Sequence, residues 1–272
     1  MMLRQLLIFL LASFISLSTL QGPPREAHYQ APEDDIQLTP ILKTPNDLTN
    51  LAIPYKIKGN ANQEQLEWCE NILAKTLNSL KANHVQEIQN LTLSFDPTIR
   101  RGLGGGHTMV IRCVNIDEQE MAAVVVHELG HIVDTGLLSS KKNKQQSQFD
   151  DRGNPVYSDD PSIQFYKISW LNSSSLKSNS PVSNFISGYS QELPQEDFAE
   201  SYAAYILHGR LFRFYAAHNE EVAKKYIFLR DVVFKGQEYQ LQESLPKILE
   251  IKNRVYDVTR LDFDLQSFWT LS

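Results

Sequence analysis

Two histidines and a glutamate between residues 127 and 131 are the side chains best suited to chemistry. His131 follows His127 by four positions, so both imidazoles lie on one face of an α-helix, one turn apart. Two rings placed this way can bind one zinc ion. Glu128 is offset by about 100° around the helix and can face a metal-bound water without binding the metal. Because zinc lowers the pKa of bound water towards about 7, the carboxylate can take its proton, the chemistry of the HExxH pattern.

A catalytic zinc site also needs a third protein ligand and an open coordination position. Three downstream residues are candidates for that ligand: Glu196, Glu200 and His208. The two glutamates lie four apart on a helix that we expect from Pro194 to about His208, so they share one face. One can bind zinc while the other accepts the N–H of a ligating histidine. The residues alone leave that choice open.

The helix that carries the two histidines is expected to be buried. It begins at Asp117, where acidic residues suit the positive end of the helix dipole, and it ends at Thr135-Gly136. Residues 121–126 are apolar on every side. The alternative is an exposed helix with a charged stripe, but two unpaired imidazoles and a carboxylate would be costly at the end of a buried helix.

The elements upstream of this helix are a helix and two strands. A helical pattern of apolar residues begins near Gln63, and alternation predicts strands around 91–95 and 109–113. The glycine-rich stretch 100–106 between the strands is expected to be a flexible turn. Cys69 lies on the helix and Cys113 at the end of the second strand. A disulfide between them and two buried free thiols both remain open.

The elements downstream are mostly helices. Residues 139–157 are polar and are expected to form a surface loop. Asp160-Pro161 then begins a short helical segment that ends near Trp170. Further helices are expected at 194–208, 220–234 and 243–258. The order predicts an α+β fold with a small mixed sheet, a buried helix that carries the metal site, and a mainly helical C-terminal half.

The N-terminal segment indicates export. Residues 1–20 contain one arginine followed by an apolar run of about 15 residues, shorter than the roughly 20 that span a bilayer. They are expected to form a signal peptide or a short N-terminal anchor. Residues 21–60 contain six prolines and are expected to form an extended arm, and residues 61–272 form the remaining domain. The protein is therefore expected to be secreted or periplasmic, and to contact a membrane only through an uncleaved N-terminal segment.

The composition limits the class of partner. Hydrophobic residues make up 42% of the chain, which is enough for a packed core. The formal net charge is −6, whereas nucleic acids and anionic lipids select basic patches. We therefore expect no nucleic-acid partner.

Two short windows resemble the gluzincin metallopeptidases of the anthrax lethal factor and pro-pro endopeptidase type. HELGHIVD at 127–134 resembles their zinc helix, and YSQELPQEDFAESY at 189–202 is similar to their second metal helix. In that second window a tyrosine precedes the ligand glutamate by seven positions. The resemblance implies a zincin-like metallopeptidase domain over 61–272. Nothing in the chain resembles the receptor-binding domain of the toxin, so toxin action is not implied.

The same resemblance implies roles for seven residues. It makes His127, His131 and Glu196 the ligands of Zn²⁺, Glu128 the general base, Tyr189 the hydroxyl that stabilises the oxyanion, and Glu200 and Asp134 supporting acidic residues beyond the ligands. In zincins the strand before the zinc helix pairs with substrate, so Gly104-Gly105-Gly106 is expected to let a peptide backbone approach closely.

Two functions fit these expectations. The first is an exported zinc endopeptidase that hydrolyses a peptide or protein substrate by attack of zinc-bound water. The alternative is a non-catalytic exported zinc-binding protein on a zincin scaffold. Glu128 and Tyr189 favour the enzyme, because a structural zinc site needs neither a general base nor an oxyanion donor.

Overall fold

A five-stranded mixed sheet lies on one side of the molecule. The computed structural model describes residues 38–40, 53–178, 180–239, 241 and 254–271. The strands run in the order β1-β2-β3-β5-β4, with β2, β3 and β5 parallel and the outer strands β1 and β4 antiparallel to their neighbours. Their bounds are Leu38–Pro40 (β1), Pro54–Lys58 (β2), Asn90–Ser94 (β3), Gly102–Gly105 (β4) and Thr108–Arg112 (β5).

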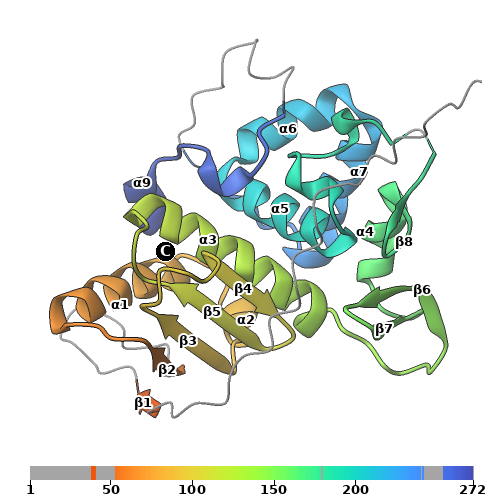
Figure 1. The fold of residues 1–272 in the computed structure, drawn as a ribbon. Coiled ribbons are helices and arrows are strands. Elements are labelled where there is room, and N and C mark those ends of the chain that lie inside the picture. Colours follow the sequence, from red (N-terminus) through yellow and green to blue (C-terminus); the bar gives the residue numbers. More distant parts are fainter. Residues whose placement is uncertain (1–37, 41–52, 179, 240, 242–253, 272) are drawn as a thin grey trace, which may run out of the picture. The chain divides into compact units, whose positions relative to one another are not determined.

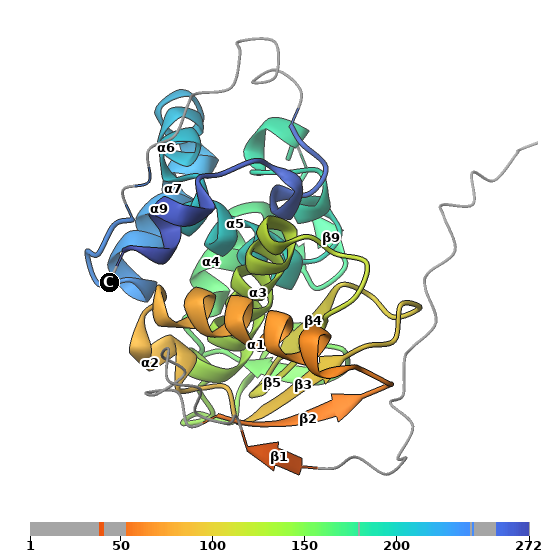
Figure 2. The ribbon, with the colours of Figure 1, turned by 90° about the vertical axis from the view of Figure 1, so that its left-hand side faces the viewer.

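Two helices cover one face of this sheet. α1 (Gln63–Asn78) lies beside α3 (Glu118–Ile132) over the strands, as Figure 2 shows, and the short α2 (Ala82–Val85) follows α1. Strands β3 and β5 alternate in the expected way, because Leu91, Leu93, Met109 and Ile111 are all buried. The period-2 pattern therefore places its apolar side chains in the core.

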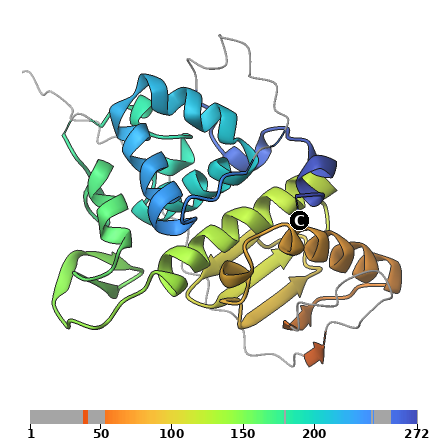
Figure 3. The same cartoon turned by 180° about the vertical axis from the view of Figure 1, so that it is seen from behind.

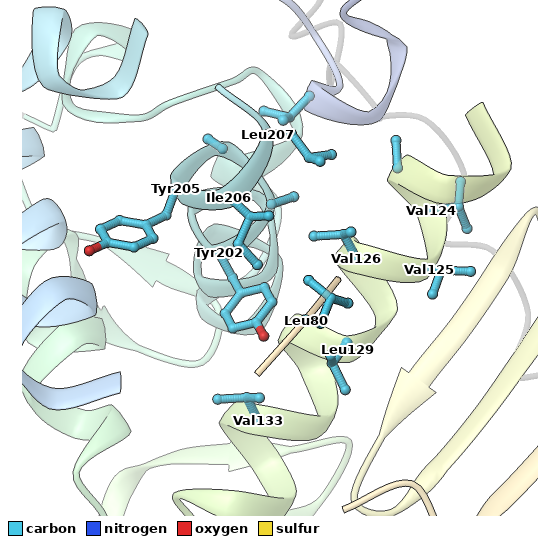
Figure 4. Close-up of a cluster of buried hydrophobic side chains, with 14 of the residues drawn as sticks. Leu80, Val124, Val125, Val126, Leu129, Val133, Tyr202, Tyr205, Ile206 and Leu207 are labelled. Carbon is cyan, nitrogen blue, oxygen red and sulfur yellow. The ribbon is translucent and has the colours of Figure 1, made fainter. Parts of the chain in front are cut away.

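The buried helix α3 lies between the sheet and the helical C-terminal half (Figure 1). It packs on β4 and β5 on one side and on α5 (Pro194–Leu207) on the other. Figure 4 shows Val126 pointing from α3 towards α5, whereas Val125 points towards the strands. Every residue from Met121 to Val133 is buried, which explains why this helix is apolar all round.

The chain beyond α3 is mainly helical. The remaining α-helices described are α4 (Ser162–Ser169), α6 (Gly209–His218), α7 (Glu220–Phe228) and α9 (Leu265–Trp269). Figure 3 shows a small hairpin, β6 (Gln146–Asp151) and β7 (Asn154–Tyr157), between the end of α3 and α4. A second strand pair is formed by β8 (Trp170–Asn172) and β9 (Ser175–Leu176). The mixed α+β class, the small mixed sheet, the buried helix and the helical C-terminal half are thus as the sequence predicted.

Two expected loops are strands. The glycine-rich stretch 100–106 contains the edge strand β4, and the polar stretch 139–157 contains the β6–β7 hairpin. Glycine and many polar residues are depleted in strands, so the low strand propensity of both stretches predicted loops instead. In β4 the pairing with β5 and the packing on α3 override that preference.

The boundaries of other segments also differ from expectation. β2 lies within the stretch 21–60 that we expected to be an extended arm, and Pro54 stands at its first residue, where a strand tolerates a missing N–H. α3 continues through a π-helical turn, Val133–Leu137, beyond its expected end. The signal peptide or anchor expected at 1–20 lies outside the described residues. So does most of the helix expected at 243–258, whose described end at 254–257 is not helical.

The two cysteines form a disulfide between Cys69 and Cys113. The bond joins α1 to the residue that follows β5, so it connects a covering helix to the sheet beneath. This settles the alternative that the sequence left open. Within the described ranges no helix is both long and apolar enough to cross a bilayer.

Candidate metal centre

The centre forms where α3 and α5 approach each other closely. Gly130 of α3 makes this approach possible, because a Cβ there would lie 3.0 Å from the Cα of Ala199 and 3.1 Å from the Cβ of Tyr202. Neighbouring Phe198 and Ala203 are fully buried, so α5 is held in the core. The glycine inside the HELGH sequence therefore sets the spacing between the two helices.

Three side chains from these helices converge on one point. The Oε2 atom of Glu196 lies 3.3 Å from the Nε2 atom of His127 and 3.2 Å from the Nε2 atom of His131. All three residues are buried, and their potential ligand atoms lie within 4.8 Å of one another. The arrangement brings together the two histidines and the glutamate that the resemblance assigns to zinc. Two imidazole nitrogens and one carboxylate oxygen are a donor set that suits zinc.

Glu200 lies behind His127, on the side away from Glu196. Its Oε1 atom is 2.9 Å from the Nδ1 atom of His127, and its side chain is fully buried. The two atoms form an ion pair when the imidazole is protonated. One turn of α5 therefore places Glu196 at the Nε2 atom of the ring and Glu200 at the Nδ1 atom. An acidic partner on the far nitrogen orients a ligating histidine and raises its basicity.

Glu128 is directed to the edge strand of the sheet. A Cβ on Gly102 would lie 2.3 Å from its Oε1 atom, and a Cβ on Gly104 would lie 2.9 Å from its Oε2 atom. The two glycines of β4 thus leave the space that the carboxylate occupies. Of the glycines expected to admit a peptide backbone, Gly104 instead contacts Glu128, while Gly106 has no atom within 4 Å of the position of a Cβ.

Tyr189 lies at the start of a short 3-10 helix, Tyr189–Gln191, just before α5. Its ring stacks beside His127, with centroids 6.1 Å apart and planes inclined by 27°. Burial, followed by the negative charge of Glu196, raises its pKa, so the phenol remains a hydrogen-bond donor. Tyr256 is 63% exposed and lies next to it, with ring centroids 5.9 Å apart.

The charges of the centre are strongly coupled. Burial acts to lower the pKa of His127 and His131, but the neighbouring glutamates, led by Glu196, together outweigh burial and raise the pKa of both. Burial acts to raise the pKa of Glu196, yet the two histidines hold it well below its ordinary value. Burial also raises the pKa of Glu128.

Two other expected residues lie away from the convergence point. The Asp134 carboxylate accepts a hydrogen bond from the Tyr166 hydroxyl, and its backbone oxygen accepts one from Ser162, so it joins the end of α3 to α4. Burial raises its pKa to about 7. His208 is buried against Phe263 and has no part in the metal cluster. Of the three candidates for the third ligand, Glu196 is the one that reaches both histidines.

Several residues at the centre escaped the sequence analysis. Gly102 leaves room for the Glu128 carboxylate, and Gly130 leaves room for α5. The backbone N–H of Val258 donates to Glu200 Oε2 at 2.8 Å. The HELGH pattern contains Gly130, but a glycine in a helix does not indicate which neighbour it admits. A backbone donor 58 positions away leaves no sequence signal.

Comparisons with protein-family models, with curated proteins and with solved structures each found no match. The resemblance in the two windows therefore rests on their residues alone.

Proposed function

We propose that this protein is an exported, zinc-dependent endopeptidase of the gluzincin type, built on a zincin-like domain. One observation carries the proposal: Glu196 Oε2 lies 3.2–3.3 Å from the Nε2 atoms of both His127 and His131. The approach of a carboxylate from one buried helix to two imidazoles of another is the donor set of this metallopeptidase class. His127, His131 and Glu196 would hold the ion.

The remaining residues have roles in peptide hydrolysis that follow from their positions. Zinc, when bound, supplies a Lewis acid and lowers the pKa of a water molecule. Glu128, held against β4, accepts the proton of that water and delivers it to the leaving amine. Tyr189 donates a hydrogen bond to the oxygen of the scissile carbonyl as negative charge develops on it. Glu200 holds the His127 ring from behind.

The edge strand β4 suits an extended peptide substrate. It pairs with β5 on one side only among the described strands, so its other edge carries backbone donors and acceptors beside Glu128. A peptide or protein segment added along that edge would pass the carboxylate. The Cys69–Cys113 disulfide supports export to a secreted or periplasmic location, since disulfides persist in oxidising compartments.

The alternative, a non-catalytic zinc-binding protein, is separated from the enzyme by one experiment. Purified protein and the Glu128→Gln and Glu196→Ala variants are assayed for bound zinc and for digestion of a peptide library, with and without chelator. We expect about one zinc per wild-type chain, zinc without cleavage in Glu128→Gln, and loss of zinc in Glu196→Ala. Cleavage that survives in Glu128→Gln excludes the general base, and zinc-loaded wild type that cuts no peptide favours the binding protein.

A further inference from the structure

A backbone group near the C-terminus completes the support of the metal centre. The two carboxylate oxygens of Glu200 point to different partners: Oε1 lies 2.9 Å from His127 Nδ1, and Oε2 accepts a 2.8 Å hydrogen bond from the backbone N–H of Val258. Glu200 is 0% exposed, so water does not compete for either oxygen. A buried carboxylate with two fixed partners has one orientation, and that orientation sets the ring of His127.

Val258 itself lies against α5. Its N–H donates to Glu200 in the middle of α5, and the 3-10 helix that it begins, Val258–Arg260, contacts both α5 and α3. The side chain of Val258 is 1% exposed. The N–H of Val258 is therefore held beside Glu200 by packing as well as by the hydrogen bond.

The segment around Val258 is anchored to the other parts of the centre as well. Arg101, which precedes Gly102 of β4, forms ion pairs with Asp257 and with Glu120 of α3, and it donates to Thr259. At the start of the segment, the N–H of Gly188 donates to Val255 and the N–H of Tyr189 donates to Tyr256. Residues 254–260 thus contact Arg101 just before β4, helices α3 and α5, and the turn that carries Tyr189.

We propose that the segment Arg254–Arg260 is a positioning element of the metal centre, and that the Val258 N–H orients His127 through Glu200. The inference rests on the proposed zinc site. It assigns a role to residues that lie outside both motif windows. The segment touches no reacting atom, so its effect appears in the affinity for the metal rather than in the chemistry alone.

A proline at position 258 removes the proposed donor selectively. Val258 is the first residue of a 3-10 helix, a position that tolerates proline because its N–H is not needed within the helix. Asp257 before it is extended, with φ −141° and ψ 119°, which is the conformation that a following proline favours. Val258→Ala is the matched control, since it removes side-chain packing and keeps the N–H.

The test measures the zinc dissociation constant of the full chain by competition with a chromogenic chelator. We expect Val258→Pro to weaken zinc binding by about 10- to 100-fold relative to Val258→Ala, the usual effect of losing a group that supports a ligand. Equal dissociation constants for the two variants would overturn the inference while leaving the zinc site intact. Wild type that binds no zinc would instead overturn the proposed function.

A second pair of variants keeps the test decisive if Val258→Pro does not fold. Asp257→Asn weakens the ion pair with Arg101 that anchors the segment, while Asp262→Asn changes an exposed carboxylate that accepts a hydrogen bond from Gln119 and makes no ion pair with Arg101. We expect weaker zinc binding in Asp257→Asn than in Asp262→Asn. The same dissociation constant in both would also count against the segment.

Discussion

At the scale of single residues, Glu128 is defined as much by what surrounds it as by its place in the HExxH sequence. Gly102 and Gly104 of β4 lie against it, but they leave space for different atoms. A Cβ at 102 meets the carboxylate, whereas a Cβ at 104 lies 2.4 Å from the backbone oxygen of Glu128. A side chain at 102 would therefore displace the carboxylate that we propose as the general base, and one at 104 would push the strand from the helix.

Gly102→Ala is expected to reduce kcat by about 100-fold or more, the lower range of general-base contributions, because the new methyl group occupies the position of the Glu128 carboxylate. Bound zinc should remain at the wild-type level, since no ligand is moved. Steady-state kinetics on a cleaved peptide and zinc analysis of the same sample measure the two effects.

Leu103→Ala on the same strand is the control for this experiment. Leu103 is partly exposed, so its truncation should change kcat little. A wild-type kcat in Gly102→Ala would show that the carboxylate does not work from its position against Gly102.

The site residues that could be predicted from the sequence are those spaced one turn apart on a helix. His127, Glu128 and His131 follow from one helical turn, and Glu196 and Glu200 follow from a second. Helix spacing alone left the choice between Glu196 and Glu200 open, the resemblance assigned Glu196 to the metal, and the crossing of α3 and α5 brings Glu196 to both histidines. Two contributions could not be predicted from the sequence. Gly102 acts by having no side chain where the Glu128 carboxylate lies, and Val258 acts through its backbone N–H, which every residue except proline has.

At the scale of elements, the placement of α5 depends on a buried ion pair. Lys225 of α7 is 1% exposed and lies 2.7 Å from an Asp197 oxygen, one residue beyond Glu196. Its ammonium group also donates to the backbone oxygen of Asn184, and the Trp170 indole donates to Asp197. Burial acts to lower the pKa of Lys225 and to raise that of Asp197, so each charge depends on the other.

Lys225→Met should lower the free energy of unfolding by about 3–5 kcal/mol, because it leaves the Asp197 carboxylate buried without its cation. Adding Asp197→Leu should recover a large part of that loss, since no charge then remains buried. Urea denaturation of the zinc-loaded proteins measures both changes.

The adjacent Lys224 provides the matched control. Its side chain is 48% exposed and pairs with Glu220 and Glu221 on the helix surface, so Lys224→Met should cost at most about 1 kcal/mol. Equal losses for Lys224→Met and Lys225→Met would show that the buried pair does not hold α7 to α5.

Elements with a strong apolar period were predicted, and elements defined by their neighbours were not. α1, β3, β5, α3 and α5 all show their burial in the sequence. β4 consists mainly of glycine because Glu128 packs on it, and the same glycines make the strand look like a turn. The β6–β7 hairpin lacks an apolar face. The helix α6 (Gly209–His218) was not predicted, because the expected helix ended at His208 and a glycine follows it.

At the scale of the whole molecule, the centre gathers segments that are distant in the sequence. Residues near 101–131, 189–200 and 254–260 meet where the sheet and the helical half join. Windows around the motif can reveal the first two, but the third follows only from the folded chain. The joint between the two halves also buries polar groups whose charge depends on pH.

His84 is such a group, and it predicts how stability responds to acid. The residue is fully buried on α2, and its Nδ1 atom lies 2.8 Å from the Tyr202 hydroxyl of α5. Burial lowers its pKa to about 4, from an ordinary value of 6.5. Between those values the unfolded chain binds a proton that the folded chain does not. The contribution of His84 to stability is therefore complete above pH 6.5 and falls as the pH is lowered towards 4.

Replacing His84 by asparagine should remove this acid-dependent loss while keeping a polar group near Tyr202. The free energy of unfolding of wild type should fall by about 2 kcal/mol more than that of His84→Asn between pH 7 and pH 4.5. Tyr202→Phe is the control, because it removes the hydroxyl but keeps the titrating imidazole and should retain the wild-type pH dependence. Parallel wild-type and His84→Asn curves, measured by denaturant titration at each pH, would show that the imidazole is not kept neutral by burial between the two halves.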